Sequence, residues 1–471
     1  MRKTKIVATM GPACDSPSVL KDLIRSGMNV ARLNMAHGDF EEHRRRIRNV
    51  RAAAEEAGAI VPILMDIKGP EIRLGTLQAP SYELKAGDRL TLTTERIEGT
   101  AERVSVTYAE LPQVIGPGGR ILIDDGLLEL TVDRVEGTEV VCTVENPALL
   151  KPRKGVNLPG VKTTLPGVTE RDVAHIDFGI AEGIDMLAVS FVRKAEDIVT
   201  IRGLLEAKGA SHIQIISKIE NEEGVDELDA IIEASDGIMV ARGDLGVEIP
   251  TEDVPLLQRR MIERCGAAGK PVIVATQMLD SMQVHPRPTR AEVSDVANAV
   301  LQGADAVMLS GETAAGKYPL ESVRMMAAIA EKTEATIDYG EKFLLRPHRS
   351  KGVTEVVSRA AVNASFELGA KAIVTPTVSG FTARMVSKYR PAAPIFAVTP
   401  NEGTLMALQL LWGVTPVRGA SAETTDDMVA SALENSGSFG WKSGDVVVIT
   451  AGVPVGRTGT TNLIRVHQVG V

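Results

Sequence analysis

The chain has 471 residues and a formal net charge of −9, and 44% of its residues are hydrophobic. This length fits two or three globular domains. The acidic balance argues against nucleic acid or an anionic membrane as the main partner. No apolar run approaches the roughly 18 residues of a transmembrane helix. The cysteines, Cys14, Cys142 and Cys265, lie far apart and are odd in number, so neither a disulfide framework nor a zinc site is expected. The apolar run near the N-terminus is too short for a signal peptide, and we expect a cytoplasmic protein.

Short apolar runs alternate with helical patterns along much of the chain. The runs that we interpret as strands cover residues 6–10, 30–35, 60–66, 184–191, 213–219, 237–242, 271–276 and 305–310. Such alternation predicts parallel pairing, and eight units of this kind fit a closed (β/α)8 TIM barrel. The alternative is an open doubly wound sheet, but no Gly-x-Gly-x-x-Gly motif follows an early strand.

Two further regions depart from the barrel pattern. Residues 71 to about 160 contain short strands and turn signals such as Gly116-Pro-Gly-Gly and Asp124-Asp-Gly, which predicts a small all-β lid domain inserted into the barrel. From about residue 345, strands and helices alternate again, as in a separate α/β domain. The predicted domains are therefore a barrel of residues 1–69 and 161–340, an inserted domain of residues 70–160 and a C-terminal domain of residues 345–471.

Residues 213–249 contain two apolar runs that each end in charged residues. Lys218 and Glu220 follow the first run, and Arg242 and Asp244 follow the second. A helical pattern lies between them, so both charged ends are expected at the same edge of one parallel sheet. Because neighbouring strands lie about 4.8 Å apart, Glu220 and Asp244 can share one hard cation, with Lys218 beside it to hold an anion. The alternative is a structural ion pair with Lys218 or Arg242.

Polar residues occur at the predicted carboxyl ends of most barrel strands, where such barrels carry their chemistry. They are Arg32, Asn34, Asp66, Lys68, Lys218, Glu220, Asn221, Arg242, Asp244, Thr276, Gln277, Ser310 and Glu312. Any one of them could be an ordinary cap or turn residue. Together they predict a metal and phosphate site, because Mg²⁺ and Mn²⁺ take few carboxylates and leave positions for substrate oxygens. Arginines such as Arg32 and Arg73 bind phosphate in a bidentate manner.

Several segments closely resemble one known family, pyruvate kinase, and the likeness runs in order along nearly the whole chain. The segments are Met65-Asp-Ile-Lys-Gly-Pro-Glu-Ile-Arg, Ile216-Ser-Lys-Ile-Glu-Asn, Met239-Val-Ala-Arg-Gly-Asp-Leu-Gly, Ala275-Thr-Gln-Met-Leu, Pro286-Arg-Pro-Thr-Arg-Ala-Glu and Leu309-Ser-Gly-Glu-Thr. The resemblance implies that phosphoenolpyruvate and ADP become pyruvate and ATP, the last step of glycolysis. It also implies Mg²⁺ or Mn²⁺ and K⁺ as cofactors, an allosteric activator and a homotetramer.

The resemblance also implies roles for individual residues. By this resemblance, the divalent cation is held by Glu220 and Asp244, and the transferring phosphoryl group by Arg73 and Lys218, of which Lys218 also stabilises the enolate. The substrate is contacted by Arg32, Gly243, Asp244 and Thr276, and enolpyruvate is protonated through Thr276, Ser310 and Glu312. The nucleotide is faced by Arg32, Asn34, His37, Arg73 and Asp125. Such a set suits phosphoryl transfer, which depends on positioning and charge neutralisation.

The monovalent-cation site departs from the family pattern. The resemblance makes Asn34, Asp66 and the carbonyl of Ile67 the K⁺ ligands. However, Ala36 and Ile67 stand where K⁺-dependent members have Ser and Thr, while Glu71 is the residue type of those members. We therefore expect K⁺ to be required but weakly bound.

The segment Thr377-Val-Ser-Gly-Phe-Thr382 lies between a predicted strand and a predicted helix. Hydroxyls and free N–H groups at a helix start can bind an anion, and Thr377, Ser379, Gly380 and Thr382 resemble the family's phosphorylated-effector pocket. Val378 and Phe381 add no positive charge, so a sugar phosphate and AMP are both plausible effectors. The alternative is a plain helix cap.

Two other functions fit parts of the sequence. Another metal-dependent barrel enzyme acting on oxo-acid enolates, such as an aldolase or lyase, would need neither the inserted domain nor a grip on nucleotide phosphates. A catalytically silent relative would be expected to lack Lys218, Glu220, Asp244 or Thr276, and all four are present.

Overall fold

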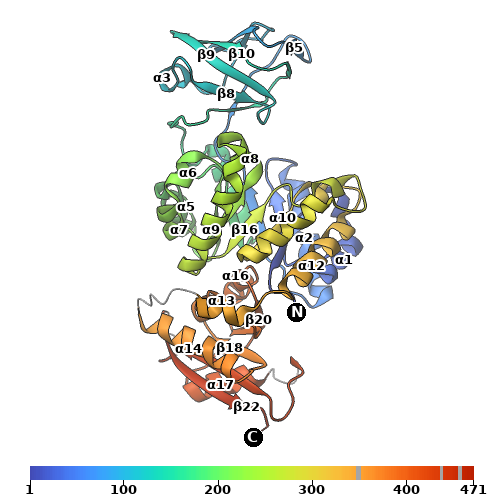
Figure 1. The fold of residues 1–471 in the computed structure, drawn as a ribbon, viewed down its shortest axis with the longest axis vertical. Helices are drawn as coiled ribbons and strands as arrows, with labels where there is room; N and C mark the ends of the chain where they lie inside the picture. The colour runs from blue at the N-terminus through green and yellow to red at the C-terminus, as the bar shows by residue number, and fades with distance from the viewer. Residues whose placement is uncertain (346–351, 435–438, 455–458, 471) are drawn as a thin grey trace.

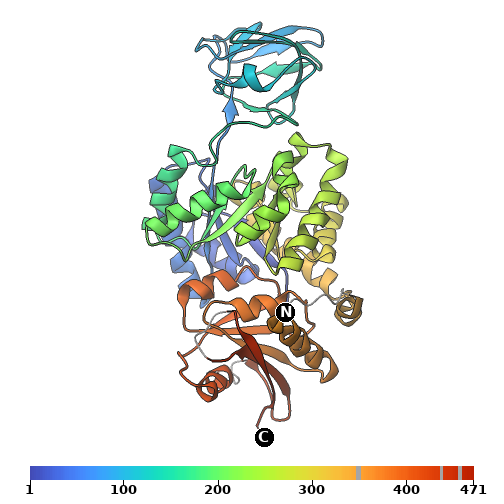
Figure 2. The same ribbon diagram turned by 90° about the vertical axis from the view of Figure 1, so that its left-hand side faces the viewer.

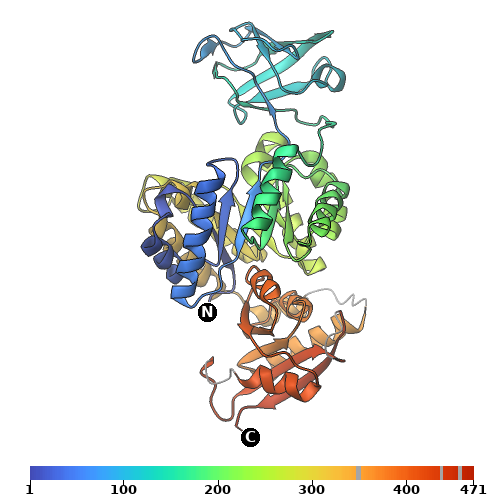
Figure 3. The same cartoon turned by 180° about the vertical axis from the view of Figure 1, so that it is seen from behind.

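The computed structural model describes residues 1–345, 352–434, 439–454 and 459–470. Three regions lie one after another along the longest axis, with the barrel in the middle and the inserted and C-terminal domains at opposite ends (Figures 1 and 2). The view from behind shows the same order (Figure 3). Of the predicted C-terminal domain, residues 346–351, 435–438, 455–458 and 471 fall outside the described part. Within the described ranges, no helix has the length and apolar character needed to span a membrane.

Eight parallel strands form a closed barrel in the order β1-β17-β16-β15-β14-β13-β3-β2, which confirms the predicted (β/α)8 fold. The strands are β1 (Lys5–Thr9), β2 (Val30–Asn34), β3 (Ile63–Ile67), β13 (Met186–Val189), β14 (Gln214–Ile219), β15 (Gly237–Ala241), β16 (Val272–Ala275) and β17 (Ala306–Leu309). They are almost entirely buried, because side chains fill the interior and helices cover the outer face.

The barrel helices follow their strands. They are α1 (Pro17–Ser26), α2 (Phe40–Ala57), α4 (Glu170–Ala181), α5 (Ala195–Ala207), α6 (Glu222–Asp226), α7 (Leu228–Ala234), α8 (Arg242–Glu248), α9 (Val254–Ala268), α10 (Arg290–Gln302), α11 (Gly311–Ala314) and α12 (Pro319–Glu334). Of these, α1, α2, α4, α6 and α10 each begin at a side chain that caps the first turn. The helical pattern expected between the two charged strand ends is divided into two helices, α6 and α7. Glu227 has a ψ of 13°, outside the helical range, and ends α6 where α7 begins.

The inserted domain is an independent β structure with its own apolar core. Its main sheet has the order β4-β12-β8-β9-β10-β6-β7, and β5 and β11 form a separate pair. The elements are β4 (Ile72–Arg73), β5 (Tyr82–Leu84), β6 (Arg89–Thr93), β7 (Arg103–Ser105), α3 (Leu111–Val114), β8 (Arg120–Ile123), β9 (Leu128–Glu136), β10 (Glu139–Val144), β11 (Ala148–Leu150) and β12 (Gly155–Asn157). β4 and β12 are neighbours, so the chain enters and leaves this domain at one place.

The C-terminal domain has a five-stranded sheet in the order β20-β19-β18-β21-β22. Its elements are α13 (Tyr339–Leu345), α14 (Val353–Glu367), β18 (Ala372–Pro376), α15 (Phe381–Ser387), β19 (Ile395–Thr399), α16 (Glu402–Leu408), β20 (Val414–Arg418), α17 (Thr425–Glu434), β21 (Val446–Gly452) and β22 (Thr461–Gln468). β20 and β22 were not predicted. Both are edge strands: β20 contains Pro416, and β22 is largely exposed, so neither has the continuous apolar run of a central strand.

The C-terminal domain closes the end of the barrel that lies opposite the inserted domain (Figures 1 and 2). Leu410, which is 1% exposed, joins the interior apolar cluster of the barrel. The Arg390 guanidinium lies 2.9 Å from the Asp305 carboxylate, and Lys5 Nζ donates to the carbonyl of Val414 at 2.6 Å. The carboxyl ends of the barrel strands therefore remain open only toward the inserted domain.

Burial of Lys5 predicts a pH dependence of stability. Burial lowers the pKa of Lys5 from 10.5 to about 7, so between about pH 7 and 10.5 the unfolded chain binds more protons than the folded chain at this residue. The unfolding midpoint should rise with pH across that window, and Lys5→Met should remove part of the rise. Thermal unfolding at pH 7 and pH 9.5 measures this, with Lys21→Met on α1 as control. An identical pH dependence in Lys5→Met and the parent chain would refute the prediction.

Candidate active site

The main cavity beside the strand ends lies between the barrel and the inserted domain. Its volume is about 610 Å³, and both regions contribute residues to its wall. The lining includes His37, Glu71, Arg73, Asp124, Asp125, Lys154, Phe191, Asn221 and Asp244. It thus brings together residues that the sequence singled out from distant segments: His37, Arg73, Asp125, Asn221 and Asp244.

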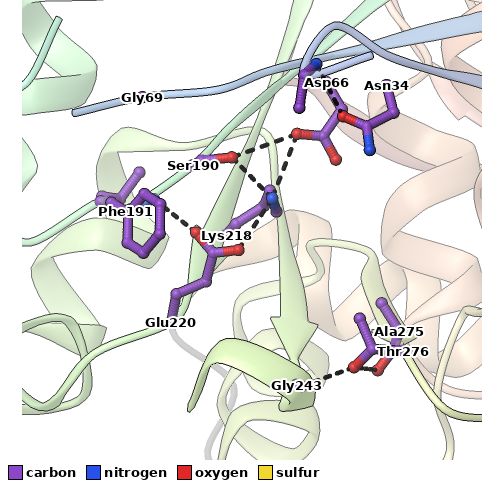
Figure 4. A network of polar contacts seen from close by, with 12 residues as sticks. Asn34, Asp66, Gly69, Ser190, Phe191, Lys218, Glu220, Gly243, Ala275 and Thr276 are labelled. Atoms are coloured by element: carbon purple, nitrogen blue, oxygen red, sulfur yellow. Dashed lines mark hydrogen bonds and ion pairs between the residues drawn. The ribbon is translucent and has the colours of Figure 1, made fainter. Parts of the chain in front are cut away.

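Lys218 on β14 is the centre of the polar network beside this cavity (Figure 4). Its Nζ lies 2.7 Å from Ser190 Oγ, 2.9 Å from Glu220 Oε1 and 3.3 Å from Asp66 Oδ1. Burial lowers the pKa of Lys218, but Asp66 and then Glu220 outweigh it, and the pKa is raised. Lys218 is therefore a protonated, buried cation with one acceptor for each of its three N–H groups.

Glu220 is 1% exposed and follows Lys218 by two positions, so it lies where the strand ends. Its Oε2 accepts the backbone N–H of Phe191 at 2.6 Å. Burial raises the pKa of Glu220 to about 7; Lys218 acts in the opposite direction, and the negative charge of Asp244 raises it further. A cation between Glu220 and Asp244 would relieve both the burial and the repulsion, and their role as divalent-cation ligands stays a prediction.

The ion pair of Glu220 with Lys218 is the alternative that the sequence left open, and it is present. Arg242, in contrast, does not pair with Asp244. Its Nη1 lies 2.7 Å from Asp295, and its Nη2 donates to the carbonyl of Thr276 at 2.7 Å. Arg242 thus ties the start of α8 to α10 and to the end of β16, which fixes the position of Asp244 in the first turn of α8.

The start of α8 also contacts Thr276. The backbone N–H of Gly243 donates to Thr276 Oγ1 at 2.8 Å, and the Thr276 hydroxyl donates to the carbonyl of Ala275 at 2.6 Å. Thr276 and Gln277 have φ angles of 66° and 52°, a left-handed conformation that is uncommon for residues other than glycine and often occurs at functional sites. A Cβ at position 243 would lie 3.6 Å from Thr276, so Gly243 leaves open space at the site and is not required to avoid a clash.

The predicted proton path begins at Thr276 and continues through Ser310 and Glu312. Glu312 is 1% exposed, and burial raises its pKa. Its carboxylate accepts the N–H groups of Leu279 at 3.0 Å and of Ser310 at 2.7 Å. These bonds fix the loops that follow β16 and β17, whereas the hydrogen bonds of the Thr276 side chain run to Ala275 and Gly243. The path itself stays a prediction.

The predicted phosphate-binding arginines lie in different surroundings. Arg32 is 8% exposed; it donates from Nε to Asp66 Oδ2 at 2.8 Å and from Nη1 to Thr9 at 2.9 Å. Arg73, on β4, lies at the cavity wall and donates to Glu71 at 2.6 Å and to the carbonyl of Arg153 at 2.7 Å. In this conformation Arg32 braces Asp66, and Arg73 is the arginine at the cavity.

The inserted domain brings an acidic turn over α8. Asp124 and Asp125 both have positive φ angles, and Lys154 pairs with Asp124 at 2.8 Å. The pKa of Asp125 is raised by burial and next by Asp244 and Asp124, which places Asp125 within electrostatic reach of Asp244. Lys154 and the Ser190–Phe191 pair were missed by sequence reasoning, although Ser190 stands at the end of a predicted strand, where polar residues were the signal.

The predicted K⁺ ligands already have partners. Asn34 Oδ1 accepts the N–H of Ala36 at 3.1 Å, and the carbonyl of Ile67 accepts the Ser190 hydroxyl at 2.7 Å. Over the described residues, no three His, Cys, Asp or Glu side chains are grouped to hold a metal ion. Glu220 and Asp244 suit a divalent cation that takes its other ligands from substrate and water, whereas the K⁺ site depends on Asn34, Asp66 and a backbone carbonyl.

Three of the four predicted effector residues, Thr377, Ser379 and Thr382, line a separate cavity of about 380 Å³ in the C-terminal domain, whereas Gly380 does not. Thr377 Oγ1 accepts the N–H of Gly380 at 2.9 Å, and the hydroxyls of Thr382 and Thr461 lie 2.8 Å apart. Ser379 also lines this cavity and is exposed. None of the described lining residues is a lysine or an arginine.

Comparison with known proteins places the chain in one family. A model described as pyruvate kinase, barrel domain, matches residues 1–323, and one described as pyruvate kinase, alpha/beta domain, matches residues 355–467. The chain is 54% identical to pyruvate kinase of Geobacillus stearothermophilus over 99% of its length and 80% of that protein. It is 48% identical to pyruvate kinase of Clostridium acetobutylicum over all of both chains. A crystal structure of a pyruvate kinase from Cryptosporidium parvum, 40% identical, superposes with a TM-score of 0.93 over 99% of this chain and 96% of that one. The chain therefore belongs to the pyruvate kinase family.

Proposed function

We propose that the cavity between the barrel and the inserted domain is where the chain carries out the reaction of its family. That reaction transfers a phosphoryl group from phosphoenolpyruvate to ADP and gives pyruvate and ATP. The observation that supports this location most strongly is Lys218, a buried cation beside a cavity whose wall carries Arg73, Asp125 and Asp244. The separate cavity in the C-terminal domain has no lysine or arginine among its described lining residues.

Glu220 and Asp244 are the proposed holders of Mg²⁺ or Mn²⁺, which supplies positive charge where the enolate of pyruvate develops. One N–H group of Lys218 also contacts Glu220 at 2.9 Å. Lys218 can turn this N–H group toward the phosphoryl group only when Glu220 has another cationic partner. Lys218 and Arg73 then bind the transferring group from two sides.

The substrate carboxylate is proposed to bind at the start of α8, where the backbone at Gly243 and Asp244 lies beside Thr276. The Gly243 N–H donates to Thr276 Oγ1 at 2.8 Å, so the two groups are adjacent, and a bound carboxylate would replace Thr276 as the acceptor of this N–H. Thr276, Ser310 and Glu312 are proposed to supply the proton that converts enolpyruvate to pyruvate. This step requires the Thr276 hydroxyl to leave the Ala275 carbonyl.

The nucleotide is proposed to bind on the side of the inserted domain, facing Arg32, Asn34, His37, Arg73 and Asp125. Asp125 of the inserted domain lies within electrostatic reach of Asp244 in the first turn of α8. Because both groups are acidic, they favour a nucleotide phosphate that carries a bound cation between them. Water that reached the phosphoryl group would compete with ADP, so the inserted domain is proposed to act as a lid. Its proposed hinges lie near Gly69 and at residues 158–160. These are the two places where the predicted inserted domain, residues 70–160, joins the predicted barrel, residues 1–69 and 161–340.

Assembly and regulation are proposed to involve the third domain, residues 345–471. β22 is at the edge of its sheet and exposes Ile464 and Val466, which suits an interface between copies in a homotetramer. The cavity at Thr377, Ser379, Gly380 and Thr382 is proposed to bind a phosphorylated effector. Val378 and Phe381 supply no positive charge there, so AMP or a sugar monophosphate is as plausible a ligand as one with two phosphates.

Replacing the buried lysine tests the assigned active site. Lys218→Met removes the cation that contacts the phosphoryl group, and we expect kcat to fall about a hundredfold or more. A lactate dehydrogenase-coupled assay with phosphoenolpyruvate and ADP measures the loss. Lys208→Met, at the end of α5, is the control and should retain full activity. Near-normal turnover in Lys218→Met would rule out the role given to this residue.

The K⁺ requirement gives a second prediction. Replacing K⁺ by tetramethylammonium should abolish most turnover, because position 71 holds Glu71 and not a lysine whose charge could substitute for that of K⁺. Ala36→Ser restores a side-chain oxygen and should lower the K⁺ concentration needed for half-maximal activity several-fold. Activity that does not change when K⁺ is replaced would contradict a K⁺ site at Asn34, Asp66 and Ile67.

The effector site is tested most cleanly at Ser379. Thr382 is 6% exposed and bonded to Thr461, so a charge there would disturb the fold, whereas Ser379 is exposed. Ser379→Asp should raise the concentration of AMP or sugar phosphate needed for activation at least tenfold and leave basal turnover unchanged. Ser443→Asp, at another exposed serine of this domain, is the control. If no such ligand activates the parent chain, the site is not an effector site.

A further inference from the structure

Ser190, the residue directly after β13, is not among the groups assigned to the reaction, yet it contacts three of them. It is 4% exposed. Its Oγ lies 2.7 Å from Lys218 Nζ, 2.7 Å from the carbonyl oxygen of Ile67 and 3.3 Å from Asp66 Oδ1 (Figure 4). Ser190 therefore lies between the lysine of β14 and the end of β3.

The directions of these hydrogen bonds follow from chemistry. A protonated lysine can only donate, so Ser190 Oγ accepts from Lys218. The serine hydroxyl has one proton to give, and the Ile67 carbonyl at 2.7 Å is a better acceptor than Asp66 at 3.3 Å. The result is a chain of two hydrogen bonds from Lys218 through Ser190 to the carbonyl of Ile67, in which each bond polarises the next.

The backbone around Ser190 is fixed by close packing. A Cβ at Gly69 would lie 2.7 Å from the Ser190 carbonyl oxygen, so only glycine fits where the chain leaves the barrel for the inserted domain. The next residue, Phe191, has a φ of 55° and donates its N–H to Glu220 Oε2 at 2.6 Å. The dipeptide Ser190–Phe191 thus contacts Lys218 by a side chain and Glu220 by the backbone.

We propose that Ser190 is a positioning residue that aims Lys218 at the phosphoryl group and links it to the Ile67 carbonyl. Without its hydroxyl, one N–H of a buried cation loses its acceptor, and Lys218 shifts toward Asp66 and Glu220. Because Ile67 is a proposed K⁺ ligand, the same two bonds couple the monovalent cation to Lys218. This inference rests on the proposed role of Lys218.

The first test compares Ser190→Ala with Ser217→Ala. Ser217 is also fully buried and adjoins Lys218 in sequence, but its hydroxyl bonds to Ser235 at 2.5 Å, away from Lys218. We expect Ser190→Ala to lower kcat about 10- to 100-fold, as for loss of a charge-assisted hydrogen bond, and Ser217→Ala to change it less than threefold. Equal effects of the two substitutions would overturn the proposal, because they would show a general packing defect.

The second test asks whether Ser190 acts through Lys218. Phosphoenolpyruvate affinity is measured with Mn²⁺ and without ADP, by thermal shift, in a double-mutant cycle with Lys218→Met. We expect Ser190→Ala to weaken binding in the parent chain and to have no further effect in Lys218→Met. The same loss in both backgrounds would overturn the proposal. Full turnover of Lys218→Met itself would instead remove the assigned role of Lys218, so the two failures are distinguishable.

The link to K⁺ is read from the same binding measurement. In the parent chain, K⁺ in place of tetramethylammonium should raise the affinity for phosphoenolpyruvate by a measurable factor. In Ser190→Ala, this ratio of the two affinities should fall toward one. Ser217→Ala should keep the parent factor. An unchanged factor in Ser190→Ala would overturn the proposed coupling between Ile67 and Lys218.

Discussion

The buried charge of Lys218 is the constraint on which the rest of the site depends. A buried cation is stable only with close opposite charges and filled hydrogen bonds, and here Asp66, Glu220 and Ser190 provide them. These residues lie at the ends of β3, β14 and β13, and Asp66 is braced in turn by Arg32 of β2. Four neighbouring barrel strands are therefore linked by the same contacts that hold Lys218 at the site of its proposed role in phosphoryl transfer.

The ion pair of Lys218 with Glu220 unites the two interpretations that the sequence left open. Glu220 is a structural partner of Lys218, and it is also the proposed ligand of a divalent cation. Negative charge accumulates from Glu220 through Asp244 to Asp125 of the inserted domain, and this repulsion helps to raise the pKa of Glu220 and Asp125. The proposed closure of the inserted domain over α8 would therefore cost electrostatic energy, and bound cations would offset that cost.

The sequence predicted the features that depend on local pattern. Eight apolar runs predicted the barrel, and the charged residues at or just beyond the ends of two runs pointed to Lys218, Glu220 and Asp244. It could not predict features that arise from neighbours in space: the edge strands β20 and β22, the Leu410 contact in the barrel interior and the break at Glu227. Ser190 shows the reason most clearly, because a serine after a strand is ordinary until β3 and β14 are seen on either side of β13.

If Glu220 exchanges Lys218 for a divalent cation while Lys218 turns to the substrate, then Mn²⁺ and phosphoenolpyruvate must strengthen each other's binding. Mn²⁺ titration followed by electron paramagnetic resonance, with and without phosphoenolpyruvate and in the absence of ADP, measures this coupling directly. We expect Mn²⁺ affinity to rise at least about fivefold with phosphoenolpyruvate, and phosphoenolpyruvate affinity to rise by the same factor with Mn²⁺. Independent binding of the two ligands would contradict the exchange at Glu220.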